Sequence, residues 1–322
     1  MANQGMVDVR ALLLAHGLDD ARRLVSDKRE RQRLEIAAAI MAEGDDNLGI
    51  CHAGFALTSL PHKDTRETVW RRDGHRITLL VESGLDRTAR PIGIPYGSKA
   101  RMILIYLQTQ AVRTQSREVE LGRSMKAWLT AMGMSNTGGA TYKMVTEQAK
   151  RIGACRLTFF TTTNGGEVRT NGAFVDQEFS LAGALNEDQP MLWQECVRLN
   201  EAFYRSLIDH PVPVSETALR HIGNKSLAID IYIWAAYRLH ALQKPTSVSW
   251  TALYGQFGAG FTLLKHFKPA FQDALRDALA AYPDARIEVD EQGLILHPSR
   301  PPIAKPGAEG DIGGELGRRQ FG

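Results

Sequence analysis

The sequence lacks the features that mark membrane, secreted and disulfide-bonded proteins. Its apolar runs, such as residues 102–107, are far shorter than the ~20 residues that cross a bilayer, so we expect no membrane-spanning helix. The first residues carry no basic stretch followed by a long apolar run, and we expect no signal peptide. Cys51, Cys155 and Cys196 form no C-x-x-C pair, which argues against a disulfide framework or a zinc finger. These absences predict a cytoplasmic protein.

Metal and cofactor motifs are also missing. Cys51, His52 and His62 come nearest to a metal-ligand set, but no fourth ligand follows at a useful spacing. The segment GIPYGSK at 93–99 resembles a phosphate-binding loop, yet Ser98 stands where that motif requires its lysine. We interpret this segment as the turn before a helix. We expect no metal and no cofactor.

Catalytic patterns are equally scarce. There is no G-x-S-x-G nucleophile motif, and no His-hydrophobic-His triplet of the kind that holds the metal of DNA-nicking enzymes. Without such a metal, no tyrosine has an evident means of activation. We therefore predict no catalytic residues and no enzymatic role. A nuclease, relaxase or primase remains the alternative from the enzyme class, and it would nick supercoiled DNA in the presence of Mg²⁺ or Mn²⁺.

What the sequence does have is a localised excess of positive charge. The 322 residues are 43% hydrophobic and 23% charged, typical of a soluble protein, and the length suggests two domains. The net charge is only +3. Residues 97–156 alone hold ten basic and three acidic residues, a local charge of +7. Such a segment faces either an anion, most commonly nucleic acid, or solvent.

The middle of the chain predicts a winged helix. Helices are expected from Gly97 to about Ala111, from Ser124 to Met132, and from Gly138 onward. In the third helix Tyr142, Val145, Ala149 and Ile152 recur at helical spacing and form a buried stripe. Two β-prone runs follow, at 157–163 and 168–179. This order matches a helix-turn-helix whose last helix enters the major groove, with the hairpin as its wing.

The second half repeats this order. One or two helices are expected within 219–242, a short helix at 250–257, a longer one to about residue 281, and a hairpin at 286–297. The repetition of this layout strengthens the winged-helix interpretation of both halves. The predicted fold class is therefore α+β, mainly helical, with two tandem winged-helix domains.

The remaining segments complete the domain plan. A charged surface helix is expected at 19–43, capped by Asp19 or Asp20, and a hairpin at 69–81 with its turn at Asp73-Gly74. The tail is rich in Pro and Gly without periodicity. We divide the chain into an N-terminal helical extension that can pack on the first domain (1–64), winged-helix domain 1 (65–188), winged-helix domain 2 (189–298) and a disordered tail (299–322).

Candidate DNA contacts lie on the two third helices and the first wing. Basic and polar side chains opposite a buried stripe are the groups that contact base edges and phosphates. In the second copy only the first turns qualify, because Asp273 and Asp277 further along would repel phosphates. The predicted DNA-binding residues are Lys143, Thr146, Lys150, Arg151, Arg169, Asn171, Thr262, Lys265, His266 and Lys268.

One run of the sequence resembles a known family. Residues 93–133, GIPYGSKARMILIYLQTQAVRTQSREVELGRSMKAWLTAMG, resemble the conserved block of plasmid-encoded RepA replication initiators. Further similar stretches extend the resemblance over roughly 90–300. They are Gly138-Gly139, Glu147 to Arg151, Phe179-Ser180, Phe257-Gly258, Ala281 to Ala285, and Gly293-Leu294 through Pro298-Ser299. Asn136-Thr137 before the third helix depart from the pattern and leave the register of that helix on DNA open.

The resemblance implies a function. Such proteins bind repeated double-stranded sites (iterons) at a plasmid origin, help to open an adjacent A·T-rich segment, and recruit host replication proteins, typically DnaA and the DnaB helicase. Relatives exist as monomers and as homodimers that repress their own gene. The runner-up interpretation is a winged-helix transcriptional repressor without an initiator role, which would protect a single promoter operator.

Overall fold

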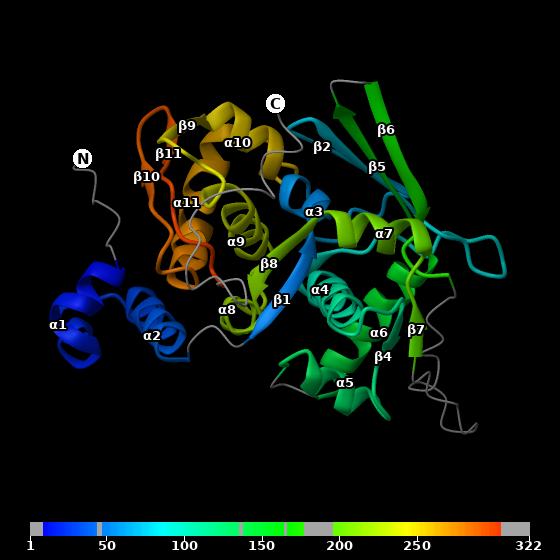
Figure 1. Cartoon of the computed structure of the whole chain (residues 1–322), viewed down its shortest axis with the longest axis horizontal. Helices are drawn as coiled ribbons and strands as arrows, with labels where there is room; N and C mark the ends of the chain where they lie inside the picture. Colours follow the sequence, from blue (N-terminus) through cyan, green and yellow to red (C-terminus); the bar gives the residue numbers. More distant parts are fainter. Residues whose placement is uncertain (1–8, 44–46, 135–137, 164–165, 177–195, 304–322) are drawn as a thin grey trace.

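The computed structural model describes residues 9–43, 47–134, 138–163, 166–176 and 196–303. Within these residues the fold is α+β and mainly helical, which confirms the predicted class (Figure 1). The first unit comprises β1 (Leu48–His52), α3 (Ala53–Leu57), β2 (Val69–Gly74), β3 (Ile77–Glu82), α4 (Gly97–Arg113), β4 (Glu118–Glu120), α5 (Met125–Ala131), α6 (Gly139–Ala154), β5 (Arg156–Thr163), β6 (Gly166–Ala173), β7 (Cys196–Arg198) and α7 (Glu201–Asp209).

The second unit has fewer elements. It comprises β8 (Pro211–Ser215), α8 (Glu216–Ile222), α9 (Ser226–Leu239), β9 (Thr246–Ser249), α10 (Trp250–Phe257), α11 (Leu264–Ala280), β10 (Ile287–Val289) and β11 (Gly293–Leu296). In both units the order is helix, strand, helix, helix, strand, strand, running α4-β4-α5-α6-β5-β6 and α9-β9-α10-α11-β10-β11. This is the winged-helix layout that the sequence predicts.

The sheets differ between the units. In the second, β9 joins the wing in the order β10-β11-β9. In the first, β4 pairs with β7 instead, and the wing is widened into the four-stranded sheet β2-β3-β5-β6. The predicted turn at Asp73-Gly74 lies two residues too early, because both residues belong to β2 and the chain turns at 75–76. Gly74 is required there, since a Cβ would lie 2.0 Å from the carbonyl oxygen of Leu57.

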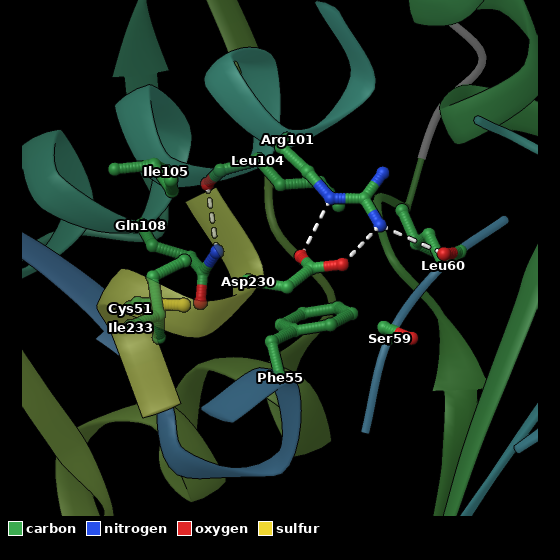
Figure 2. A pocket seen from close by; sticks show the side chains of 10 residues that line it. All are labelled: Cys51, Phe55, Ser59, Leu60, Arg101, Leu104, Ile105, Gln108, Asp230 and Ile233. Atoms are coloured by element: carbon green, nitrogen blue, oxygen red, sulfur yellow. Dashed lines mark hydrogen bonds and ion pairs between the residues drawn. The ribbon is translucent and has the colours of Figure 1, made fainter. Parts of the chain in front are cut away.

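The two units share one hydrophobic core. Antiparallel pairing of β1 with β8 joins them, with Leu48 opposite Ser215, and α3 and α4 pack on α9 (Figure 1). A buried ion pair lies in this contact (Figure 2). The guanidinium of Arg101 on α4 donates to both carboxylate oxygens of Asp230 on α9, at 2.6 and 2.7 Å. His62 Nε2 lies 2.8 Å from the same carboxylate.

The N-terminal extension differs from the sequence prediction. It forms two helices, α1 (Val9–Leu24) and α2 (Lys28–Glu43), and the cap between them is Asp27, whose carboxylate accepts from the backbone of Arg29 and Glu30. The pair has a small core of its own. Within the predicted extension 1–64, β1 and α3 contact β3 and α4 of the first unit, whereas α2 contacts α11 and α8 of the second unit.

Three predicted boundaries shift for physical reasons. β1 and α3 belong to the first unit's core rather than to a separate extension, while β7 and α7 pack on the first unit through β4 and β6. Residues 299–303, assigned to the tail, contact the second unit, where Ile303 is buried and the Arg300 carbonyl accepts from Tyr282. Residues 304–322 lie outside the described part, as do Asn136-Thr137, the turn at 164–165 and the end of the predicted strand at 177–179.

Candidate nucleic-acid interface

α6 is the third helix of the winged-helix order α4-α5-α6 in the first unit, and one of its sides is buried in the core. It begins at Gly139, after Gly138, with no side-chain cap. Val145, Ala149 and Ile152 have no exposed surface, as the predicted stripe requires. The opposite side of the helix therefore faces solvent.

That solvent side carries both signs of charge. Lys143, Glu147 and Lys150 are exposed and stand four and three residues apart, so they share one face. Met144 beside them is 46% exposed. Lysine contacts phosphates or guanine, and a carboxylate accepts from the amino group of cytosine. The face offers the side-chain types that contact base edges in a major groove.

Arg151 occupies a different environment from its neighbour Lys150. It is only 9% exposed. Its guanidinium reaches Asp64 at 3.0 Å, the carbonyl oxygen of Ile94 at 3.0 Å and Glu147 at 2.7 Å, and it lies 4.9 Å above the ring of Tyr96. The hydrogen bond from Arg151 holds the pKa of Asp64 below its usual range. In this arrangement Arg151 fastens α6 to the segment that precedes α4, and its guanidinium is occupied by protein groups rather than open to DNA.

That preceding segment is the apparent phosphate loop. Gly93 and Gly97 have φ angles of +103° and +74°, and α4 begins at Gly97. A Cβ on Gly93 would lie 2.7 Å from the Arg151 guanidinium. The segment is thus the turn before a helix, as the sequence predicts. Gly93 allows close packing against Arg151, and both glycines permit the positive φ angles.

The other predicted residues of the first unit are spread over α6 and the wing. Thr146 is half-buried, and its hydroxyl has no hydrogen-bond partner among the described residues. Arg169 is exposed on β6, with its guanidinium 5.4 Å from the ring centre of Phe160. Asn171 lies on β6 opposite Thr158, and its side chain is outside the described part. Arg169 is therefore the described wing residue that is placed to meet a phosphate.

In the second unit the first turns of α11 are open to solvent. Thr262, Lys265 and His266 are exposed. Lys268 is half-buried, with its ammonium 5.2 Å from the ring centre of Trp250. Phe267, Phe271 and Leu275 have no exposed surface and form the buried side of this helix.

The two third helices lie apart. Figure 1 shows α11 on the left and α6 on the right of the central β1–β8 pair. The structure therefore does not gather the predicted residues into one cluster, but forms two separate groups. Two helix-turn-helix units can contact two successive major-groove segments of one duplex, about 10 base pairs apart.

A third basic group was not predicted from the sequence. Arg71, His75 and Arg76 are exposed near the turn of the β2–β3 hairpin. The strand register brings this turn to the same end of the sheet as the first wing, and the Arg76 carbonyl accepts from the backbone of Thr162. The only signal in the sequence is the cluster of cations around residues 71–76.

Arg72 links this hairpin to the second unit. Its Nε donates to the carbonyl oxygen of Gln256 on α10 at 2.8 Å. Burial lowers the pKa of Arg72. The widened sheet of the first unit is thereby fixed against α10 of the second.

His52, one of the residues nearest to a metal-ligand set in the sequence, is engaged in packing. His52 Nδ1 accepts from the backbone of Gly54, and its Nε2 lies 2.9 Å from the hydroxyl of Ser206. Burial lowers the pKa of His52 to about 3, so the ring is neutral at pH 7. Within the described ranges, no three His, Cys, Asp or Glu side chains are grouped to hold a metal ion. None of the helices in those ranges has the length and apolar character that crossing a bilayer requires.

Solved structures and curated proteins give limited matches. Domains 2 and 3 of RctB, as a selenomethionine derivative, superpose with a TM-score of 0.45 at 13% identity, covering 76% of this chain and 94% of that one. A second structure of RctB domains 2–3 gives a TM-score of 0.43 at 12% identity, with coverage of 76% and 95%. No curated protein matches the sequence.

A family model gives a further match. The model described as "Plasmid encoded RepA protein" matches residues 94–252. This span includes α4, α5, α6, the first wing and the first half of the second unit. Residues 94–252 of the chain are therefore similar to plasmid-encoded RepA proteins, as the resemblance in the sequence indicated.

Proposed function

We propose that this chain is a plasmid replication initiator that binds repeated double-stranded sites at the origin. The observation that carries the proposal is the outer face of α6, where Lys143 and Lys150 are exposed in the family-matched part of a helix-turn-helix. The first turns of α11 and Arg169 on the wing supply further contacts. Phosphate contacts from these cations provide much of the affinity and make it depend on salt.

Opening of the origin requires no active-site residue in this proposal. Binding energy from several repeats drives bending and capture of the adjacent A·T-rich strands. Recruitment of DnaA and the DnaB helicase, a monomer–homodimer equilibrium, repression of the chain's own gene and a cytoplasmic location are further parts of the same proposal, and each rests on the family. We infer that the chain acts by binding rather than by catalysis.

The deciding experiment compares two duplexes across a salt series. Fluorescence anisotropy measures binding to the repeats beside the chain's own gene and to a scrambled duplex of equal length. We expect a preference of at least a few hundred-fold that persists at moderate salt. Equal and steeply salt-sensitive binding to both duplexes would show that the chain binds DNA without sequence specificity.

Two further assays separate the initiator from the alternatives. On a supercoiled origin, with and without DnaA, bound protein should make thymines reactive to permanganate; unreactive thymines would contradict origin opening. A footprint confined to one promoter operator would favour the repressor. Nicks produced with Mg²⁺ or Mn²⁺ would show an enzyme instead.

A further inference from the structure

The candidate DNA helix of the second unit is bound along its side by the N-terminal extension. Arg33 on α2 is 3% exposed and reaches three carboxylates. It donates to Asp273 Oδ1 at 2.7 Å, to Asp277 Oδ1 at 2.8 Å and to Glu30 Oε1 at 2.6 Å. A fourth hydrogen bond joins Arg33 to the backbone carbonyl of Asp273 at 3.0 Å. The guanidinium therefore holds α2 against α11.

Two more cations complete this cluster. Lys225 Nζ lies 2.9 Å from Asp277, and Arg29 lies 3.4 Å from Asp273. Burial opposes ionisation of Asp273, but the hydrogen bond and the charge of Arg33 outweigh it and lower its pKa. The two aspartates of α11, which alone would repel a phosphate backbone, are thus compensated by cations from elsewhere in the fold.

The ion pairs also fix the direction of α2. Arg29 meets Asp273, and Arg33 meets both Asp273 and Asp277 one turn further along α11, so the two helices run in the same direction. The first turn of α2 therefore lies one helical turn beyond Pro269, where the exposed start of α11 ends. Lys28 is exposed in that turn, and the Arg29 side chain is 75% exposed.

We propose that the first turn of α2 is a further DNA-contacting element, in which Lys28 and Arg29 bind the phosphate backbone beside the segment that α11 contacts. Arg33 is a positioning residue, which holds α2 in place and compensates Asp273 and Asp277. The inference rests on the proposed function, because it requires α11 to lie on DNA. Both helices lie outside the family-matched residues 94–252.

The test uses the full chain with Lys28→Ala and Arg29→Ala combined. Binding to the repeat duplex and to the scrambled duplex is measured by anisotropy across a salt series. We expect the slope of log K against log salt to fall by about 2, with the same proportional loss of affinity for both duplexes, because phosphate contacts do not depend on sequence. The matched control is Arg22→Ala with Arg23→Ala on α1, which removes the same charge and should leave the slope unchanged.

A second set of variants tests the positioning role. Arg33→Gln should weaken binding to both duplexes, and adding Asp273→Asn and Asp277→Asn should restore much of the affinity, since the uncompensated charges are then gone. Circular dichroism confirms folding, and if Arg33→Gln does not fold, the Lys28 and Arg29 variant decides.

The outcomes separate this inference from the proposed function. A wild type that prefers the repeats, together with an unchanged slope for the Lys28 and Arg29 variant, overturns the inference alone. A wild type without preference overturns the proposed function.

Discussion

Two neighbouring residues on α6, Lys150 and Arg151, lie in different environments, although the sequence predicted both as DNA contacts. Lys150 is exposed, whereas Arg151 is held by Asp64, Ile94 and Glu147. Helical spacing predicted the buried stripe correctly, because Val145, Ala149 and Ile152 follow one periodicity. It could not separate Lys150 from Arg151, since two partners of Arg151, Ile94 and Asp64, lie 57 and 87 residues earlier in the chain.

The first prediction concerns the exposed lysines. Lys143→Ala with Lys150→Ala should weaken DNA binding and reduce the salt slope by about one per lost phosphate contact. Thermal stability should stay nearly unchanged, because surface substitutions usually shift it by less than about 0.5 kcal/mol. Anisotropy and thermal denaturation measure the two effects, and an unchanged slope would show that these lysines face solvent in the complex.

Arg151→Ala, in contrast, should lower the stability of the protein. Removing a guanidinium that bonds to charged and backbone groups is expected to cost about 1.5–3 kcal/mol of unfolding free energy. Urea denaturation measures this loss, with Lys150→Ala as the neighbouring control. Equal stability of the two variants would contradict the positioning role of Arg151.

His52 makes the folding stability of the protein decrease at acid pH. The pKa of His52 in the folded state is lowered to about 3 from an ordinary 6.5. Between these pH values the ring is protonated in the unfolded chain but stays neutral in the folded chain. Stability from this residue is therefore complete above pH 6.5 and declines as the pH falls. Between pH 7 and pH 5 the loss is about 2 kcal/mol.

The comparison for this pH effect is His52→Asn, whose side-chain oxygen can replace Nδ1 as acceptor for Gly54. Urea unfolding at both pH values should show a smaller pH dependence in this variant than in the wild type. Equal pH dependence would mean that another group titrates.

At the scale of elements, α10 and the start of α6 were the most predictable. α10 begins and ends at the predicted residues Trp250 and Phe257, and α6 begins one residue after Gly138. β1 and β8 were missed, because each is five residues long and they pair across more than 150 residues of chain. The helix expected at 19–43 is two helices, because α1 begins at Val9 and ends at Leu24, and Asp27 caps the separate helix α2.

The C-terminal segment yields an element-scale prediction. A chain ending after Ile303 should keep its stability and its DNA affinity. A chain ending after Ser299 should lose about 1.5–3 kcal/mol, because it lacks the buried side chain of Ile303 and the carbonyl that accepts from Tyr282. Denaturation of the two truncated chains measures the difference, and equal stability would show that 300–303 contribute nothing.

At the scale of the whole molecule, the two units behave as one body because their cores are continuous. Asp230 at their contact is buried, and although burial opposes its ionisation, Arg101 and His62 lower its pKa. Asp230→Leu should cost about 3–5 kcal/mol, since it leaves the Arg101 guanidinium buried without its counter-ion. Replacing both, with Arg101→Met and Asp230→Leu, should recover much of this loss.

Calorimetry tests the same contact at this scale. The wild type should unfold in a single transition. The Asp230→Leu variant should unfold at a lower temperature, and the double variant should return toward the wild type. Equal unfolding temperatures for all three would show that the pair is unimportant.

The contact between α2 and α11 also has a consequence for synthesis. Arg33 and Asp277 are 244 residues apart, so the first helices leave the ribosome long before their partner is made. At ~5–20 residues per second, this delay lasts roughly 10–50 s. During that time the first unit can fold before α11 is made, while Arg33 has only Glu30 of its own helix as a partner. The last step of folding is then the docking of α2 on α11.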